Sequence, residues 1–223
     1  MIRTTPPRLG FCPMGKFVFS NEDAVRYKNA VRRKLDEWAI PTIDLEGVLE
    51  DGLVKDQGHV EAAVAHFREA GIDALFMPHC NFGTEGAVGM IAKKLRVPVL
   101  LWGPRDEAPL PDGTRLRDSL CGLFASSKVL VKLGVPFTYI ENCRVDDDLL
   151  RDGVDTFMRA VNVADALRSG TRIGLIGQRI DFFWSTIINE SELLQRFNVE
   201  VQPFDMVEFI AAVKQRAAGA RDA

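Results

Sequence analysis

Short apolar runs alternate with longer amphipathic stretches along most of the chain, and this pattern predicts strands and helices in turn. Strands are expected at residues 8–14, 41–46, 72–78, 97–104 and 135–142, and helices at residues 21–38, 59–71, 84–96, 119–134 and 147–170. The strands are almost continuously apolar, which is typical of a parallel sheet with helices on both faces. Residues 1–168 are therefore predicted to form one doubly wound α/β domain of the flavodoxin or Rossmann type, with a parallel sheet of five strands.

The same alternation restarts after residue 168. Strands are expected at residues 171–177 and 199–205, and helices at residues 189–197 and 206–220. A single βαβα unit of this size is small for an independent domain. Residues 169–223 are therefore predicted to be the start of an incomplete second α/β unit. Its uncovered apolar face predicts self-association.

Composition narrows the class of protein without indicating an activity. The 223 residues are 47% apolar and 26% charged, which predicts a folded core rather than disorder. The net charge of −3 includes both signs and argues against a nucleic-acid or membrane-surface protein. No run reaches the ~18 apolar residues of a membrane span, and the N-terminus does not resemble a signal peptide, so a cytoplasmic protein is expected. Four widely spaced cysteines predict free thiols.

Polar and aromatic residues gather just after the predicted strands, where open parallel sheets bind their ligands. Residues 77–89, "MPHCNFGTEGAVG", place a His, a Cys, an Asn and a Glu close together after one strand. Two roles for His79 fit the sequence: a buried structural histidine, or a hydrogen-bonding group at the ligand edge. The glycines of this stretch follow neither the dinucleotide-binding nor the P-loop pattern. Hydrogen-bonding groups beside aromatic rings suit a polyol or a sugar.

Two longer segments carry a resemblance to a known family. They read "ALFMPHCNFGTEGAVGMIAKKLRVPVLLWGPRDE" and "TRIGLIGQRIDFFWSTIINESELLQRFNVEVQPFDMVEF". The order and spacing of their strands, polar loops and helices resemble the amino-terminal half of the L-fucose/L-arabinose isomerase family, from Gly10 to about Phe209. Asn198 stands where that family more often has Gly.

The resemblance implies a metal-dependent isomerase of carbohydrate metabolism that interconverts aldoses and ketoses, usually with manganese (Mn²⁺). It implies metal ligands in later domains, so that no metal is expected on this chain and no catalytic residue is assigned. It also implies a homo-oligomer, either a trimer or a hexamer, or completion by a complementary C-terminal chain. The first domain would cover a sugar substrate bound in a neighbouring subunit. On this interpretation, residues 77–89 form a substrate-covering loop, and the expected substrate contacts are Lys16, Phe17, His79, Asn81, Phe82, Trp102 and Arg105.

Two other classes of protein remain open from the sequence. The polar and aromatic strand edge also fits a non-catalytic sugar-binding or regulatory α/β module. A small flavodoxin-like protein that binds a nucleotide or a flavin shares the predicted fold, but the lack of a phosphate-binding fingerprint argues against it.

Overall fold

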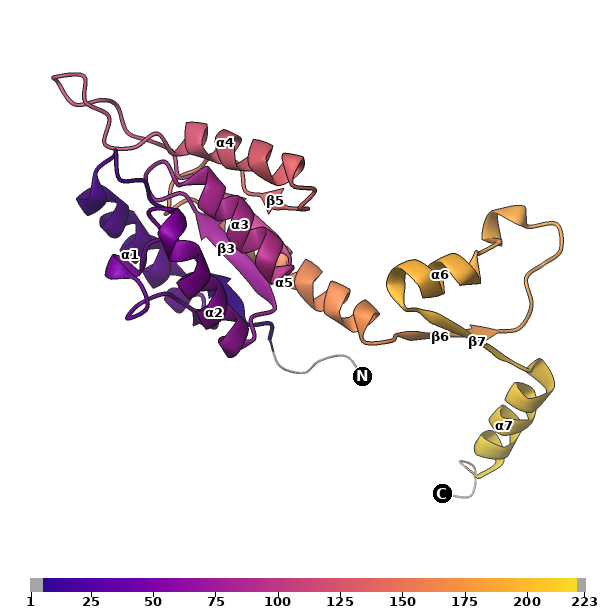
Figure 1. Cartoon of the computed structure of the whole chain (residues 1–223). Helices are drawn as coiled ribbons and strands as arrows, with labels where there is room; N and C mark the ends of the chain where they lie inside the picture. Colours follow the sequence, from indigo (N-terminus) through magenta and orange to yellow (C-terminus); the bar gives the residue numbers. More distant parts are fainter. Residues whose placement is uncertain (1–5, 220–223) are drawn as a thin grey trace. The chain divides into compact units, whose positions relative to one another are not determined.

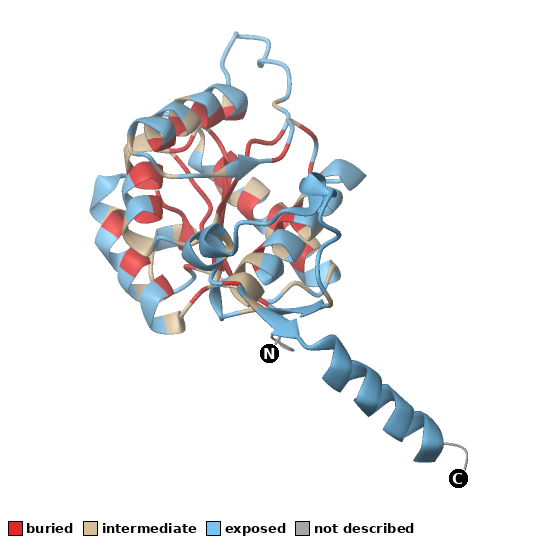
Figure 2. Cartoon of the chain, turned by 90° about the vertical axis from the view of Figure 1, so that its right-hand side faces the viewer, coloured by how far each residue is buried: buried red, intermediate tan, exposed pale blue. Residues whose placement is uncertain are grey.

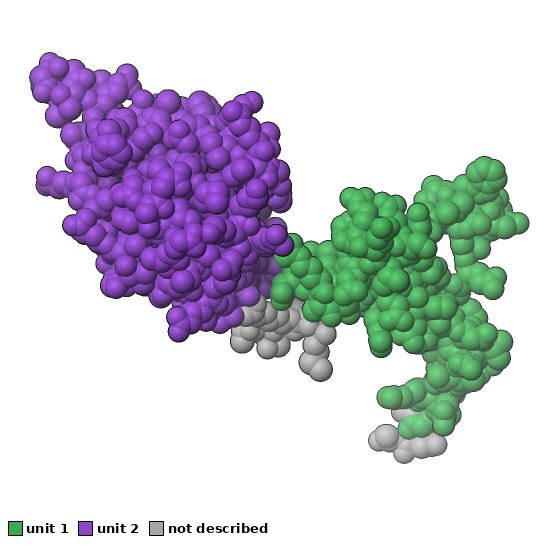
Figure 3. All heavy atoms as spheres, in the orientation of Figure 1, with its two compact units in different colours: residues 1–4, 163–223 green, residues 5–162 purple. Residues whose placement is uncertain are grey.

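The computed structural model describes residues 6–219, which fall into two compact units (Figure 3). The first unit extends to Asn162 and the second begins at Val163. This boundary lies inside the long helix α5 (Asp148–Arg168), whereas the sequence predicts a boundary where that helix ends. Predictions for residues 1–5 and 220–223 lie outside the described residues.

A five-stranded parallel sheet forms the centre of the first unit and confirms the predicted doubly wound fold. Its strand order is β2-β1-β3-β4-β5, and every neighbouring pair is parallel. The strands are β1 (Leu9–Phe11), β2 (Thr42–Ile43), β3 (Ala74–Pro78), β4 (Val99–Trp102) and β5 (Thr138–Tyr139). They are shorter than the predicted runs. After β1, for example, Pro13 lacks the amide hydrogen that a regular strand ladder needs.

Helices cover both faces of this sheet, as predicted. Helix α1 (Asn21–Glu37) and helix α5 pack on one face (Figure 1). The other face carries α2 (Val60–Ala70), α3 (Glu85–Leu95) and α4 (Ser119–Lys132). Each layer of helices buries its own apolar cluster against the sheet, and Figure 2 shows these buried residues inside the unit. No helix among the described residues is long and apolar enough to cross a membrane.

The helix ends follow local sequence signals. The hydroxyl of Ser20 accepts a hydrogen bond from the amide of Asp23 at 3.1 Å, so Ser20 is the N-cap of α1. Gly71 ends α2 in the left-handed conformation, with φ of 62°, which favours glycine. Three short 3₁₀ turns were not predicted; they span Glu50–Gly52, Gln57–His59 and Trp184–Thr186.

The second unit has the predicted order of strand, helix, strand and helix. Strands β6 (Arg172–Ile176) and β7 (Glu200–Phe204) pair in parallel, with α6 (Glu190–Phe197) between them in sequence. Helix α7 (Met206–Gly219) follows and is exposed along its whole length (Figure 2). The unit leaves large apolar side chains open to solvent; Trp184 and Val207 are each 77% exposed. It therefore forms almost no core of its own.

Candidate functional site

The carboxyl edge of the sheet carries the candidate site. Strands β1 and β3 are neighbours, yet α1 after β1 and α3 after β3 lie on opposite faces of the sheet. This divergence is the topological switch point at which open α/β sheets bind ligands. Beyond β1 the chain stays extended at Met14, which bridges to Val54 on one side and to His79 on the other. The loops after β1, β2 and β3 are therefore held together at this edge.

Asn81 organises the loop that the sequence singled out. Its side-chain amide donates to the carbonyls of Lys16 at 3.2 Å and Ser20 at 3.3 Å. Its side-chain oxygen accepts from the amides of Phe82 and Gly83 within the same loop. Asn81 is only 2% exposed, so these bonds stay shielded from water. The side chain thereby joins the loop after β1 to the loop after β3.

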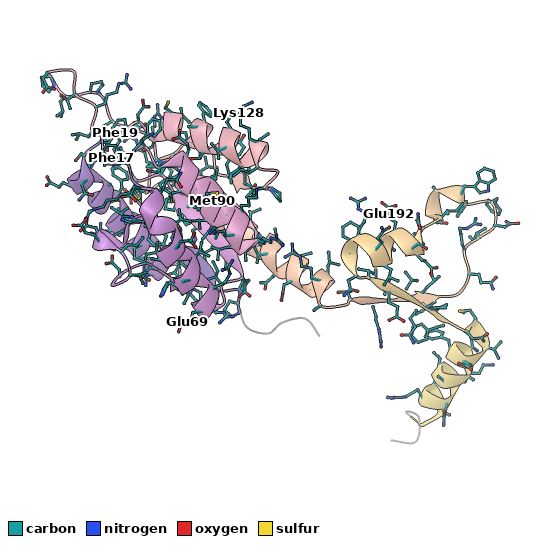
Figure 4. All side chains as sticks on the ribbon, in the orientation of Figure 1. Phe17, Phe19, Glu69, Met90, Lys128 and Glu192 are labelled. Atoms are coloured by element: carbon teal, nitrogen blue, oxygen red, sulfur yellow. The ribbon has the colours of Figure 1, made fainter. Side chains whose placement is uncertain are left out.

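A cationic and aromatic surface lies on top of this joint, and we name it the aromatic edge: Lys16, Phe17, Phe19, Phe82 and Glu85. The ammonium of Lys16 lies 4.4 Å from the centre of the Phe82 ring and 3.3 Å from a carboxylate oxygen of Glu85. Phe82 also stacks on Phe19, with ring centres 5.3 Å apart. Phe17 is 80% exposed. Figure 4 shows Phe17 and Phe19 at the same end of the unit, opposite the end at which Glu69 lies on α2.

His79 lies beneath the loop and is completely buried. Its Nε2 is 2.8 Å from the hydroxyl of Ser126 on α4, and its Nδ1 is 3.2 Å from the carbonyl of Met77. Burial lowers its pKa to about 4, although backbone hydrogen bonds to Met77 and Trp102 oppose this shift. The imidazole is therefore neutral near pH 7. The ring packs directly against Gly83 of the loop, because a Cβ at Gly83 would lie 2.4 Å from it. Gly83 also has φ of 84°, a left-handed conformation that favours glycine.

The structure places the other two predicted contacts elsewhere. Trp102 is completely buried in the apolar cluster beneath α1 and α5, and its indole nitrogen lies 3.3 Å from the sulfur of Cys143. Arg105 is exposed and lines a separate cavity of about 440 Å³ beside α1, to which the aromatic edge does not contribute. Of the seven predicted contacts, the structure brings together Lys16, Phe17, Asn81 and Phe82.

A buried charge cluster beside the site was missed by sequence reasoning. The guanidinium of Arg117, with 1% of its side chain exposed, lies 2.7 Å from Asp23 of α1 and 3.4 Å from Asp106. It also pairs with Glu107 and stacks on Tyr27, 3.6 Å from the ring centre. The short distances to Asp23 and Asp106 are ion-pair contacts without aligned hydrogen bonds at the Arg117 nitrogens involved. These contacts tie the base of the loop between β4 and α4 to α1.

The cluster also shifts the pKa values of Glu107 and Tyr27. Burial by itself would raise the pKa of Glu107, but hydrogen bonds from Tyr27 and Arg117 outweigh it and lower the pKa to about 2. Burial, followed by the hydrogen bond to Glu107, raises the pKa of Tyr27 to about 12. Near pH 7 Glu107 is thus a fixed negative charge and Tyr27 is a neutral hydrogen-bond donor to it. No local signal marks the cluster, because Asp23 and Arg117 lie in separate parts of the sequence.

The described residues do not supply an evident metal or redox centre. Within residues 6–219, no group of three or more His, Cys, Asp or Glu side chains is placed to hold a metal ion. The cysteines are free thiols, as predicted. Burial raises the pKa of Cys12 and of Cys143, and it raises that of Cys80 to about 12, so these three remain protonated.

The fold and this edge define a doubly wound α/β domain with a candidate ligand-binding surface at its switch point. A family model described as "Fucose/sulfoquinovose isomerase, N-terminal domain" matches residues 10–168, which is most of the chain and nearly all of the first unit. The chain therefore belongs to the fucose/sulfoquinovose isomerase family, and residues 10–168 are its N-terminal domain. This confirms the resemblance to fucose isomerases and an isomerase relationship. A comparison with curated proteins found no match.

Proposed function

We propose that the first unit is the substrate-covering domain of a metal-dependent aldose–ketose isomerase that acts on a sugar of the L-fucose or L-arabinose type. The observation that carries the proposal is the aromatic edge, placed at the switch point of a domain of this family. Sugars present apolar C–H faces and hydroxyl groups, and aromatic rings beside charged groups match both features.

Each group of the aromatic edge has a distinct task in this proposal. The exposed ring of Phe17 packs against the C–H face of the sugar. Lys16 donates hydrogen bonds to hydroxyl groups of the sugar, and Glu85 accepts hydrogen bonds from them. These bonds replace part of the ion pair between Lys16 and Glu85. Asn81 and His79 act from below by holding the loop in place. Together these residues orient the sugar and keep water away from it.

Isomerisation moves a hydrogen between two neighbouring sugar carbons and needs a base and an electrophile. The described residues do not fit a Mn²⁺ ligand set, so we derive no chemical step on this chain. In the proposal, the base and the Mn²⁺ ligands belong to a complementary catalytic part, either in a neighbouring subunit of a homotrimer or hexamer or in a separate C-terminal chain. The exposed apolar side chains of the second unit are the contact surface for that assembly, which works in the cytoplasm.

The test measures sugar binding and turnover separately. The chain is titrated with L-fucose, L-arabinose and other aldoses, and isomerisation is assayed with Mn²⁺ for the chain alone. Phe17→Ser should weaken binding of the preferred sugar about tenfold, since aromatic packing contributes roughly 1–1.5 kcal/mol. Phe124→Ser is the matched control, because Phe124 is a similarly exposed phenylalanine, on α4. If the parent chain and Phe17→Ser bind the sugar with equal affinity, the aromatic edge is not the sugar site.

The turnover assay distinguishes the isomerase from the second candidate. Binding without turnover by the chain alone, followed by Mn²⁺-dependent turnover once a catalytic part from a family member is added, supports the covering domain. Binding that never leads to turnover favours a non-catalytic sugar-binding or regulatory module, for which the exposed and preformed aromatic edge is the supporting observation. Turnover by the chain alone would refute the placement of the metal site in another part.

A further inference from the structure

The wall of the cavity beside α1 carries more basic than acidic side chains. The cavity has a volume of about 440 Å³, within the roughly 300–1,000 Å³ range of small-molecule sites. Residues of α1 and of the loops after β4 and β5 line it. Five basic and four acidic side chains contribute to its wall.

All four carboxylates of the wall already have basic partners. Glu37 and Asp146 both pair with Lys34, at 3.4 and 3.0 Å. Asp106 and Glu107 pair with Arg117, which is buried and does not line the cavity. These last two carboxylates therefore share one cation that lies behind the cavity wall, and Glu107 also lies 3.7 Å from Arg26.

Three guanidinium groups of the wall remain without a carboxylate. Among the described residues, no acidic side chain lies within ion-pair distance of Arg33, Arg105 or Arg144. They come from α1, from the loop after β4 and from the loop after β5, and all three residues are exposed. The amide of Arg105 donates to the carbonyl of Cys143 at 2.8 Å, which joins the two loops that carry Arg105 and Arg144. The backbone of Arg105 and Arg144 is thus held in place, while their guanidinium groups have no carboxylate partner among the described residues.

We infer that this cavity binds a phosphate monoester of sugar size, with the phosphate held by Arg33, Arg105 and Arg144. Guanidinium groups match phosphate oxygens in geometry and donate strong charged hydrogen bonds to them. The remaining volume, lined by the paired carboxylates and by Lys34, suits hydroxyl groups. This site is separate from the aromatic edge and goes beyond the proposed function.

The inference is tested by calorimetric titration of the whole chain at low ionic strength. The ligands are glucose 6-phosphate, glucose, inorganic phosphate and sulfate. Glucose 6-phosphate should bind more tightly than either inorganic anion, and glucose should not compete with it. Arg33→Gln and Arg144→Gln should each weaken its binding about tenfold or more, as expected for a lost charged hydrogen bond. Arg151→Gln is the control, because Arg151 is exposed on α5 and does not line the cavity.

The possible outcomes separate this site from the proposed sugar site. Phe17→Ser should leave binding of glucose 6-phosphate unchanged, so failure of the aromatic edge would not affect the result. The inference is overturned if the parent chain does not bind glucose 6-phosphate, or if Arg33→Gln and Arg144→Gln bind it as tightly as the parent. Sulfate binding as tight as that of glucose 6-phosphate would overturn the assignment to a phosphorylated sugar.

Discussion

Protonation of His79 should make the stability of the first unit depend on pH. Burial lowers the pKa of this completely buried imidazole from 6.5 to about 4 in the folded chain. In the unfolded chain the side chain keeps its ordinary value. Between these two pH values the unfolded state binds more protons than the folded state, so stability rises with pH. The contribution of neutral His79 is complete above about pH 6.5 and is lost as the pH falls towards 4.

The size of the effect follows from the difference between the two pKa values. A shift from 6.5 to about 4 corresponds to about 3 kcal/mol of unfolding free energy, at roughly 1.4 kcal/mol for each pKa unit. The steepest part of the curve lies near pH 5, with a slope of about 1.2 kcal/mol per pH unit. A domain stability is typically about 5–15 kcal/mol, so this change is large enough to measure.

Urea unfolding between pH 4.5 and 7.5 provides the assay. In a Trp184→Phe background, the fluorescence reports Trp38 and Trp102, and Trp102 is completely buried in the first unit. His79→Gln should be less stable than the parent near pH 7 but should lose the extra slope near pH 5. His66→Gln, which changes a partly exposed histidine on α2, should keep the slope of the parent. Equal slopes for His79→Gln and the parent would refute the assignment of this dependence to His79.

Three further predictions follow from single contacts. Arg117→Gln leaves the largely buried Asp106 without a cationic partner and leaves Asp23 only its pair with the exposed Arg26, so it should cost about 3 kcal/mol of unfolding free energy. A loss below about 1 kcal/mol in urea unfolding would contradict the cluster. Gly122→Ala places a Cβ 1.6 Å from the carbonyl oxygen of Phe82 and should cost about 2 kcal/mol or more, whereas Gly15→Ala meets only ordinary contacts and should change little; equal thermal midpoints would reject this packing. Cys121 is the exposed cysteine of the four and should react first with a thiol reagent in the folded chain, which mass spectrometry of the labelled peptides checks; equal labelling of a buried cysteine would contradict the described burial.

The order of elements was predictable because it depends on local chemistry. The apolar runs and amphipathic stretches predicted all five strands and all five helices of the first unit, since burial on both sheet faces needs that alternation. The start of α1 is likewise local, because the hydroxyl of Ser20 reaches an amide in the first helical turn. Strand ends were less accurate, because an apolar residue such as Cys12 is buried equally well in a strand or just after it.

The candidate site was predictable only in part. The strand-end rule correctly grouped Lys16 with Phe82, because parallel strands bring their carboxyl ends to one edge. The same rule does not say on which side of the sheet a side chain falls. It therefore listed Trp102 and Arg105 beside them, although the first is buried in a core and the second lines another cavity.

The sequence by itself determined the parallel α/β architecture, the restart of the pattern near residue 170 and membership of a sugar-isomerase family. Periodicity, capping and the order of motifs are properties of neighbouring residues, so they can be read along one chain. Only the tertiary structure decided that His79 is a neutral support, that Arg117 pairs with Asp106 and Glu107, and that Arg105 is left without a carboxylate. Burial and charge pairing depend on residues from distant segments, and these meet only when the chain has folded.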